Sequence, residues 1–294
     1  MNKFVIITLS TFFGFALQGC GKKEAAEATA PIPVTASTPQ NDASLLDEAR
    51  GHYYGKDYAK AIPLLQQLAN KGNADAQNLI GQSYASGEGV EKDAKKAAQF
   101  FRLSADQGNK AGQYNLGFSY NTGNGVAQDN AEAEKLWRLS ASQGYALAQY
   151  NLGMLYAIGQ GVVQNDAEAI KLWENAASQG MARAQYNLGI AYGFGKVSVE
   201  RDPAKAVNYF RLAAKQGEAA AMGNLGSFYT QGLGVEKDTP RGAMWILLAA
   251  QAGDKSSIEN QQRFESIPQY EELRRMVVAL MDKCVVNNDF SKCD

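Results

Sequence analysis

The hexapeptide Ala148-Gln149-Tyr150-Asn151-Leu152-Gly153 recurs unchanged at residues 184–189 and in altered form at 76–81, 112–117 and 221–226. Glycines at positions 72, 108, 144, 180, 217 and 253 divide the chain into five units of 36 or 37 residues. A fixed period of this length is typical of a repeat protein, in which each unit packs mainly on its neighbours. The period therefore predicts a stack of similar units and not a single globular core.

Each unit predicts two helices joined by a glycine turn. In the second unit, Leu116 and Tyr120 are four residues apart with polar residues between them, which is the spacing of an amphipathic helix. Gly117 lies inside that helix, where glycine costs about 1 kcal/mol relative to alanine. We therefore expect close contact with another helix at the recurring glycines. These are Gly81, Gly117, Gly153, Gly189 and Gly226.

The second helix of each unit begins at a predicted N-cap. Asp129 follows the Gly-x-Gly-Val turn, and Glu132 three residues later suggests a capping box. The same position holds Asp93, Asn165, Asp202 and Asp238 in the other units. In the fourth unit, the turn beginning at Gly195 lacks the second glycine and one residue is inserted, so we expect it to be reshaped.

The AQYNLG motif, the Gly-x-Gly-Val turn and the 36-residue period resemble the Sel1-like repeat, a relative of the tetratricopeptide repeat. The resemblance implies an all-α fold: an α-solenoid of helix pairs in a right-handed superhelix. It covers residues 73–253 as five repeats, at 73–108, 109–144, 145–180, 181–217 and 218–253. Residues 44–72 are interpreted as a degenerate tetratricopeptide-like pair, and 254–294 as a helical cap with helices at 256–264 and 270–284.

The N-terminus resembles a bacterial lipoprotein signal. Lys3 precedes an apolar run from Phe4 to Leu17, which is too short to span a bilayer, and Gly19 precedes Cys20. The resemblance implies a signal peptide at 1–19, a lipid on Cys20 and, with Gly21 after it, an outer-membrane protein that faces the periplasm or the cell surface. An ordinary secretory signal is the alternative. Residues 20–43 are polar and small, and predict a flexible tether.

Cys284 and Cys293 are the other two cysteines of the chain. Because an exported protein folds in an oxidising compartment, we expect them to form a disulfide; two free thiols are the alternative.

The composition gives little support to an enzyme, a metal protein or a nucleic-acid-binding protein. The formal net charge of −1 lacks the basic excess that binds nucleic acid. The single histidine, His52, cannot assemble a metal site, and neither a nucleophile motif nor a phosphate-binding loop is present. We therefore expect no cofactor, no metal and no catalytic residue.

Two recurring columns could contact a ligand. The first holds Asn115, Asn151, Asn187 and Asn224. Such asparagines bind ligands in some tetratricopeptide domains, but their uniformity favours a structural role in which they satisfy backbone groups between helices. The second is an apolar stripe on the first helices of units two to four: Tyr114, Phe118, Tyr150, Met154, Ile158, Tyr186, Ile190 and Phe194.

In the resembled family the first helices line the concave side, so the stripe implies a binding groove there. Packing of these side chains between repeats would explain the stripe equally well. The recurring tyrosines suit a scaffold role, and the five variable residues suit partner contact.

The sequence therefore suggests a non-enzymatic, monomeric envelope lipoprotein that binds a protein or peptide through this groove, as an adaptor, an assembly factor or an inhibitor such as an immunity protein. The alternative is a protein that binds cell-wall fragments or small ligands, with possible weak hydrolase activity. Relatives of that kind carry a cysteine pair in each repeat, which this chain lacks.

Overall fold

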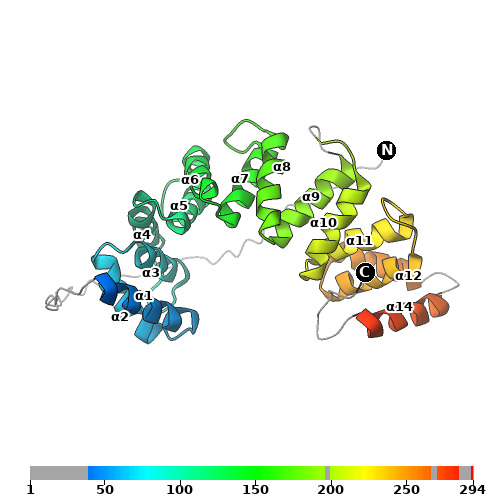
Figure 1. Cartoon of the computed structure of the whole chain (residues 1–294), viewed down its shortest axis with the longest axis horizontal. Helices are drawn as coiled ribbons and strands as arrows, with labels where there is room; N and C mark the ends of the chain where they lie inside the picture. Colours follow the sequence, from blue (N-terminus) through cyan, green and yellow to red (C-terminus); the bar gives the residue numbers. More distant parts are fainter. Residues whose placement is uncertain (1–38, 196–198, 266–269, 285–292, 294) are drawn as a thin grey trace, which may run out of the picture. The chain divides into compact units, whose positions relative to one another are not determined.

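The computed structural model describes residues 39–195, 199–265, 270–284 and 293. The described residues, which begin at 39, belong to one unit. The described part is all-α, with fourteen helices and no strand, which confirms the predicted α-solenoid class (Figure 1). Cys20 and the predicted signal peptide lie outside the described residues.

Five helix pairs form the repeats. Their first helices are α3 (Ala74–Ser86), α5 (Lys110–Thr122), α7 (Ala146–Ile158), α9 (Ala182–Phe194) and α11 (Ala219–Gln231). Their second helices are α4 (Ala94–Asp106), α6 (Asn130–Ser142), α8 (Asp166–Ser178), α10 (Pro203–Lys215) and α12 (Thr239–Gln251). The pair α1 (Pro39–Tyr54) and α2 (Tyr58–Asn70) precedes them, and α13 (Lys255–Glu265) and α14 (Tyr270–Cys284) follow.

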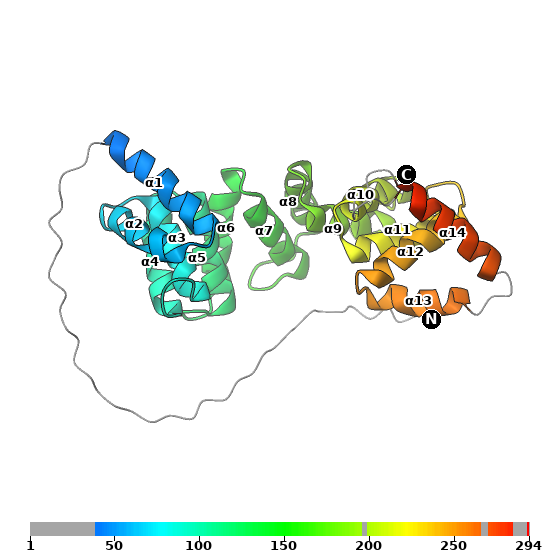
Figure 2. The same ribbon diagram turned by 90° about the horizontal axis from the view of Figure 1, so that it is seen from below.

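From α1 to α13, each helix packs on the next one along the chain, and α14 packs on α12; the first helices α3 and α5, and α9 and α11, also contact each other (Figure 2). Apolar residues at helical spacing fill the seams between them, and the largest fully buried side chains include Leu116, Leu188, Phe210 and Trp245. This arrangement of neighbour on neighbour follows from the period of the sequence.

The chain becomes helical earlier than the sequence suggested. The predicted tether ends at residue 43, but α1 begins at Pro39, so residues 39–43 belong to the helix. Proline suits the first turn of a helix, where its missing N–H is not needed. Asp42 in that turn suits the positive end of the helix dipole and pairs with Lys71 Nζ at 2.8 Å. These features outweigh the polar composition from which the tether was inferred.

The predicted N-caps are confirmed, because Asp93, Asp129, Asn165, Asp202 and Asp238 each accept a backbone N–H at the start of a second helix. The capping box was wrong. The Asp129 N–H donates to the carbonyl of Tyr120 at 2.9 Å, and the Glu132 carboxylate pairs with Lys135 at 3.1 Å. The turn therefore ties the second helix back to the tyrosine of the first helix, which leaves no free N–H for the glutamate.

Four of the turns begin with a glycine in the left-handed conformation. Gly87, Gly123, Gly159 and Gly232 cap their first helices with φ between 70° and 83°, a conformation that favours glycine. Gly195 caps α9 with φ 69° but ψ 109°, so the turn of the fourth repeat departs from the others, as expected. Residues 196–198 of that turn are not described.

The recurring helical glycines lie at close helix contacts, as predicted. A Cβ at Gly153 would come within 2.6 Å of the Trp173 indole, and one at Gly189 within 2.5 Å of the Phe210 ring. Gly81 and Gly117 face aromatic rings in the same way, and Gly226 faces the Gly242 carbonyl. The absence of a side chain on the first helix therefore makes room for the large residue of the second helix.

The two predicted C-terminal helices are present as α13 and α14. Leu273 and Val277 of α14 are buried in the same core cluster as Trp245 and Leu248 of α12. Cys293 is also buried in this cluster. The side chain of Cys284 lies outside the described part, so its disulfide with Cys293 stays a prediction.

Candidate protein-interaction surface

The apolar stripe divides into packed and exposed residues. We call the solvent-facing side of α3, α5, α7, α9 and α11 the first-helix face. Five stripe residues are half-buried, and three are exposed. The half-buried ones are Tyr114, Tyr150, Met154, Tyr186 and Ile190.

The three tyrosines belong to the scaffold, as the sequence suggested. Tyr114 packs edge-on against Tyr145 at 5.3 Å between ring centroids, and Tyr186 packs on Phe210 at 6.1 Å. Burial raises the pKa of Tyr114, Tyr150 and Tyr186 above the ordinary value of a phenol. These rings therefore pack between helices of the solenoid and expose little surface area to a partner.

Met154 and Ile190 also pack inward. Met154 lies against the core cluster of the central repeats, and its sulfur accepts a hydrogen bond from Asn187 Nδ2 at 3.1 Å. Ile190 packs against the core cluster of the C-terminal repeats. The structure thus attaches two of the five variable residues to the scaffold.

Phe118, Ile158 and Phe194 are 47, 62 and 59% exposed. Phe194 makes an edge-on contact with Phe228, at 6.1 Å between centroids. Burying apolar area stabilises by about 25 cal/mol per Å² removed from water, so exposed side chains of this size are suited to contact with a partner. These three residues are the candidates that the structure leaves for direct contact.

The asparagine column is structural, but through bonds other than those expected. Asn115 Nδ2 donates to Asn78 Oδ1 at 2.7 Å, and Asn151 Nδ2 donates to the Tyr114 hydroxyl at 3.3 Å. Both bonds join first helices of adjacent repeats. Only Asn224 bonds a backbone group, the carbonyl of Ala220 in its own helix, at 2.8 Å. The column therefore links neighbouring repeats mainly through side chains.

A recurring pair of glutamines, which was not predicted from the sequence, joins the two helices within each of four repeats. The C-cap glutamine of each of four second helices donates to a buried glutamine of the first helix before it, at 2.7 or 2.8 Å. The pairs are Gln107 with Gln77, Gln143 with Gln113, Gln179 with Gln149, and Gln216 with Gln185. Their signal was visible, because a glutamine precedes the recurring glycine at 108, 144, 180 and 217.

The recurring tyrosine at the end of each first helix joins the charged second helices. The Tyr156 hydroxyl donates to Glu134 Oε1 at 2.7 Å and accepts a bond from Arg138. Burial and the glutamate together raise the pKa of Tyr156 to about 12. Tyr192, beside Glu174, has its pKa raised to about 12 by the same two causes. Such bonds hold the seams together and do not by themselves suggest chemistry.

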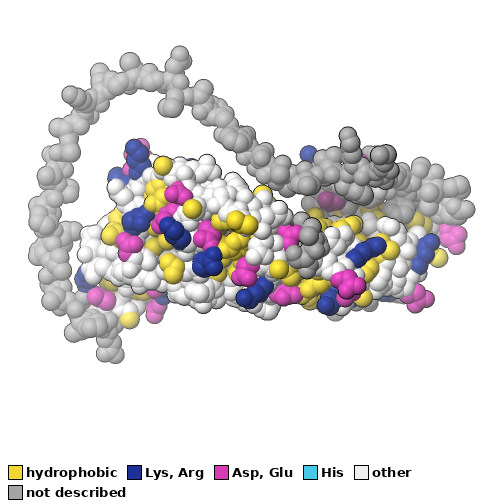
Figure 3. Space-filling model, turned by 90° about the horizontal axis from the view of Figure 1, so that it is seen from above, with side chains coloured by type: hydrophobic (Ala, Val, Ile, Leu, Met, Phe, Trp, Pro, Cys, Tyr) yellow, Lys and Arg dark blue, Asp and Glu magenta, His cyan; other side chains and the backbone are white. Residues whose placement is uncertain are grey.

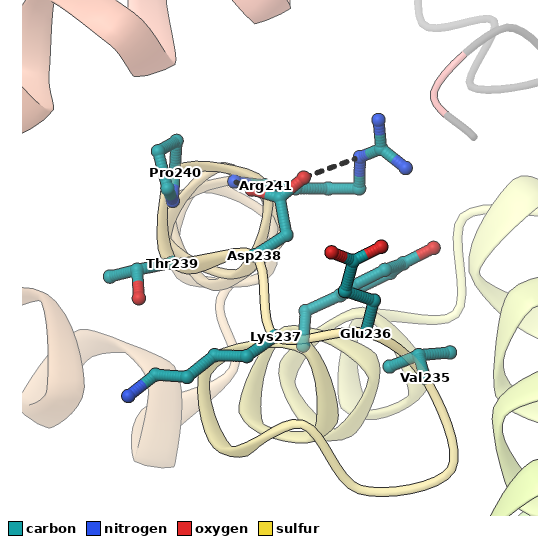
Figure 4. Close-up of a pocket in the computed structure, with 8 residues that line it drawn as sticks. Val235, Glu236, Lys237, Asp238, Thr239, Pro240 and Arg241 are labelled. Atoms are coloured by element: carbon teal, nitrogen blue, oxygen red, sulfur yellow. Dashed lines mark hydrogen bonds and ion pairs between the residues drawn. The ribbon is translucent and has the colours of Figure 1, made fainter.

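Two clefts lie at the turns. The cleft in Figure 4, of about 610 Å³, is lined by Tyr229, residues 235–240 and Arg241, with Arg241 paired to the capping Asp238. A cleft of about 630 Å³ occupies the equivalent place beside Tyr192, Asp202 and Lys205. Because the two clefts use the same positions of two repeats, they are a consequence of the repeat architecture. They give no specific support to a small-ligand site.

The single histidine of the chain, His52, lies near two carboxylates. His52 lies 3.9 Å from Glu48 and 3.7 Å from Asp57, and no group of three metal-ligating side chains occurs among the described residues. On the face in Figure 3, basic and acidic side chains are interspersed, without the basic patch that nucleic acid requires. Within the same described ranges, no helix is long and apolar enough to cross a membrane.

A search against protein-family models matched the Sel1 repeat at residues 49–73, 74–109, 110–145, 146–181, 182–218 and 219–254. The chain belongs to the Sel1 repeat family. The model matches six repeats, the first of which overlaps the pair interpreted as degenerate from the sequence. Sel1 repeats generally form non-catalytic scaffolds for protein–protein interaction.

Solved structures give the same fold. The Sel1 repeat protein from Oxalobacter formigenes is 30% identical, with a TM-score of 0.70, over 82% of this chain and 97% of that one. The c5321 protein, a protective antigen of uropathogenic Escherichia coli strains, is 25% identical, with a TM-score of 0.53, over 86% of this chain and 67% of that one. The immunity protein Pa5087 from Pseudomonas aeruginosa is 21% identical, with a TM-score of 0.46, over 87% and 86%. A likeness as weak as this third one carries no argument about function. Among curated proteins, no match was found.

Proposed function

We propose that this protein is a non-enzymatic, lipid-anchored envelope protein whose first-helix face binds a protein partner. The exposure of Phe118, Ile158 and Phe194 beside scaffold residues of the same stripe carries the proposal. A few large apolar anchors supply most of the energy of a typical protein interface. An adaptor, an assembly factor and an inhibitor would all use this surface in the same way.

Affinity capture with matched variants tests the surface. A tagged chain of residues 20–294 carrying Cys20→Ser is incubated with an envelope extract of the source bacterium, and bound proteins are identified by mass spectrometry. The double variant Phe118→Ser/Phe194→Ser should lose the specific partner. The control is Leu139→Ser, because Leu139 is 53% exposed but lies on the second helix α6. Equal capture by all three proteins would place binding elsewhere.

The lipid anchor has its own test. Cys20 follows an apolar segment that resembles a lipoprotein signal, so processing would leave a lipidated N-terminus as the attachment to the outer membrane. The full-length chain should fractionate with membranes, and its Cys20→Ser form should appear in the soluble periplasm. Unchanged fractionation of Cys20→Ser would exclude lipidation at this residue without affecting the assignment of the binding surface.

A further inference from the structure

Charged residues are distributed unequally between the two kinds of helix. Each of α4, α6, α8 and α10 carries at least three charged side chains. The five first helices together carry three: Asp75, Lys110 and Arg183. The last second helix, α12, carries only Arg241, so the contrast holds for the first four repeats, in which the first helices are the charge-poor ones.

The three charges lie at the beginnings of their helices, and Arg183 is near enough to Tyr114 and Tyr150 to influence their pKa values. Lys110 is the first residue of α5, and Asp75 and Arg183 are the second residues of α3 and α9. Asp75 is already engaged, since it pairs with Arg50 at 2.8 Å and accepts from Asn109 at 2.7 Å. From the third residue onward, each first helix has no charged side chain.

Three amide groups of this face already form hydrogen bonds. Asn115, Asn151 and Asn187 are half-buried, and their Nδ2 groups bond to residues of the preceding first helix. The exposed residues of the stripe are Phe118, Ile158 and Phe194, whose side chains cannot donate or accept hydrogen bonds. This set suits apolar side chains better than the hydroxyl groups of a glycan.

We infer that the first-helix face recognises an uncharged, apolar segment of its protein partner, an inference that rests on the function proposed above. From their third residue onward, α5, α7 and α9 carry no charged side chain, so a charged segment lying there would lose its hydration without gaining an opposite charge from these residues.

A displayed library of random twelve-residue peptides tests this chemistry. Peptides are selected on the chain of residues 20–294 with Cys20→Ser, and each is then measured by fluorescence anisotropy. The recovered peptides should be depleted of Asp, Glu, Lys and Arg relative to the library. Their affinity should change less than about twofold between 50 and 500 mM NaCl, because screening affects only interactions between charges. Phe118→Ser should weaken them at least tenfold, and Leu139→Ser should not.

The possible outcomes distinguish an error in the chemistry inferred for the partner from an error in the proposed binding surface. Charged peptides that depend on Phe118 would overturn this inference and leave the proposed surface intact. Uncharged peptides that ignore Phe118 and Phe194 would overturn the surface itself, and the inference with it. Failure to recover any peptide dependent on these residues, or binding of a soluble peptidoglycan fragment that Phe118→Ser abolishes, would also overturn the inference.

Discussion

Adjacent residues of the same helix have opposite roles in this protein. Gly117 on α5 faces the Trp137 ring across the seam to α6, whereas the next residue, Phe118, faces solvent. The glycine returns in every repeat, but the following position holds Gln82, Phe118, Met154, Ile190 and Ser227. Positions like that of the glycine are repeated because the two helices of each unit must pack on each other in the same way. Positions on the first-helix face are released from that requirement and can specify a partner.

The largest loss of stability should come from removing a buried apolar side chain between packed helices. Leu152 is 3% exposed and belongs to the core cluster of the central repeats, so Leu152→Ala should lower the free energy of unfolding by about 2–5 kcal/mol. Leu147→Ala on the same helix is the control, because Leu147 is exposed and should change stability by less than about 0.5 kcal/mol. Urea unfolding followed by circular dichroism measures both variants, and equal losses would contradict the distinction between seam and surface.

Adding a methyl group at a close contact between helices should destabilise the protein less. A Cβ at Gly153 would lie 2.6 Å from Trp173 Nε1, which itself donates to the Tyr150 carbonyl at 3.2 Å. Gly153→Ala should therefore destabilise by about 1–3 kcal/mol.

A second glycine gives a control with the opposite sign. Gly51 lies inside α1 with nothing within 4 Å of its would-be Cβ, so Gly51→Ala should stabilise by about 0.5–1 kcal/mol. The same urea titration compares the two variants. A stabilising Gly153→Ala would mean that the indole moves aside at no cost.

Much of the seam could be predicted from the sequence, because its residues recur. The period indicated the helix pairs, the glycine column indicated close contact, and the N-caps followed from Asp93 and its equivalents. The capping box failed because the Asp129 N–H is taken by the Tyr120 carbonyl, a bond that depends on how the turn folds back. Local sequence rules do not include that tertiary competition.

The exposure of residues on the first-helix face was harder to predict, because it also depends on tertiary contacts. Sequence spacing placed eight residues on one stripe, but spacing alone cannot show how far each side chain reaches into the adjacent repeat. Met154 and Ile190 occupy the same repeat position as Phe118, yet they pack on core clusters while Phe118 stays exposed. Exposure depends on the neighbours that the fold supplies, and these differ along the stack.

Alanine substitutions within the stripe should distinguish its packed residues from its exposed ones. Tyr186 packs on Phe210 and Ile190 lies beside it in the same cluster, so Tyr186→Ala should cost more than about 2 kcal/mol of unfolding free energy. Phe118→Ala should cost less than about 1 kcal/mol, since the ring is half exposed. Thermal and urea unfolding check this order. A loss of several kcal/mol for Phe118→Ala would make the whole stripe part of the core and remove the basis of the proposed surface.

The smallest effect should appear only at high pH. Tyr156 has a pKa of about 12 in the folded chain, against 10.0 for an ordinary phenol, because it is buried and bonded to Glu134. Below pH 10 the hydroxyl is protonated in both the folded and the unfolded state, so it adds no pH dependence. Between pH 10 and 12 the unfolded chain releases this proton first, and the free energy of unfolding falls.

Tyr53 and Tyr192, whose pKa values are also about 12, contribute to the same fall. Tyr114, Tyr150 and Tyr186, whose pKa values burial also raises, contribute in the same direction. Tyr156→Phe removes one of these contributions, so its stability should decline less steeply than that of the wild type over this range. Comparison with each protein's own value at pH 7 separates the slope from the loss of the bonds to Glu134 and Arg138. Parallel pH curves for the two proteins would show that the Tyr156 hydroxyl titrates alike in the folded and unfolded chain, and that this bond across the seam between repeats does not protect its proton.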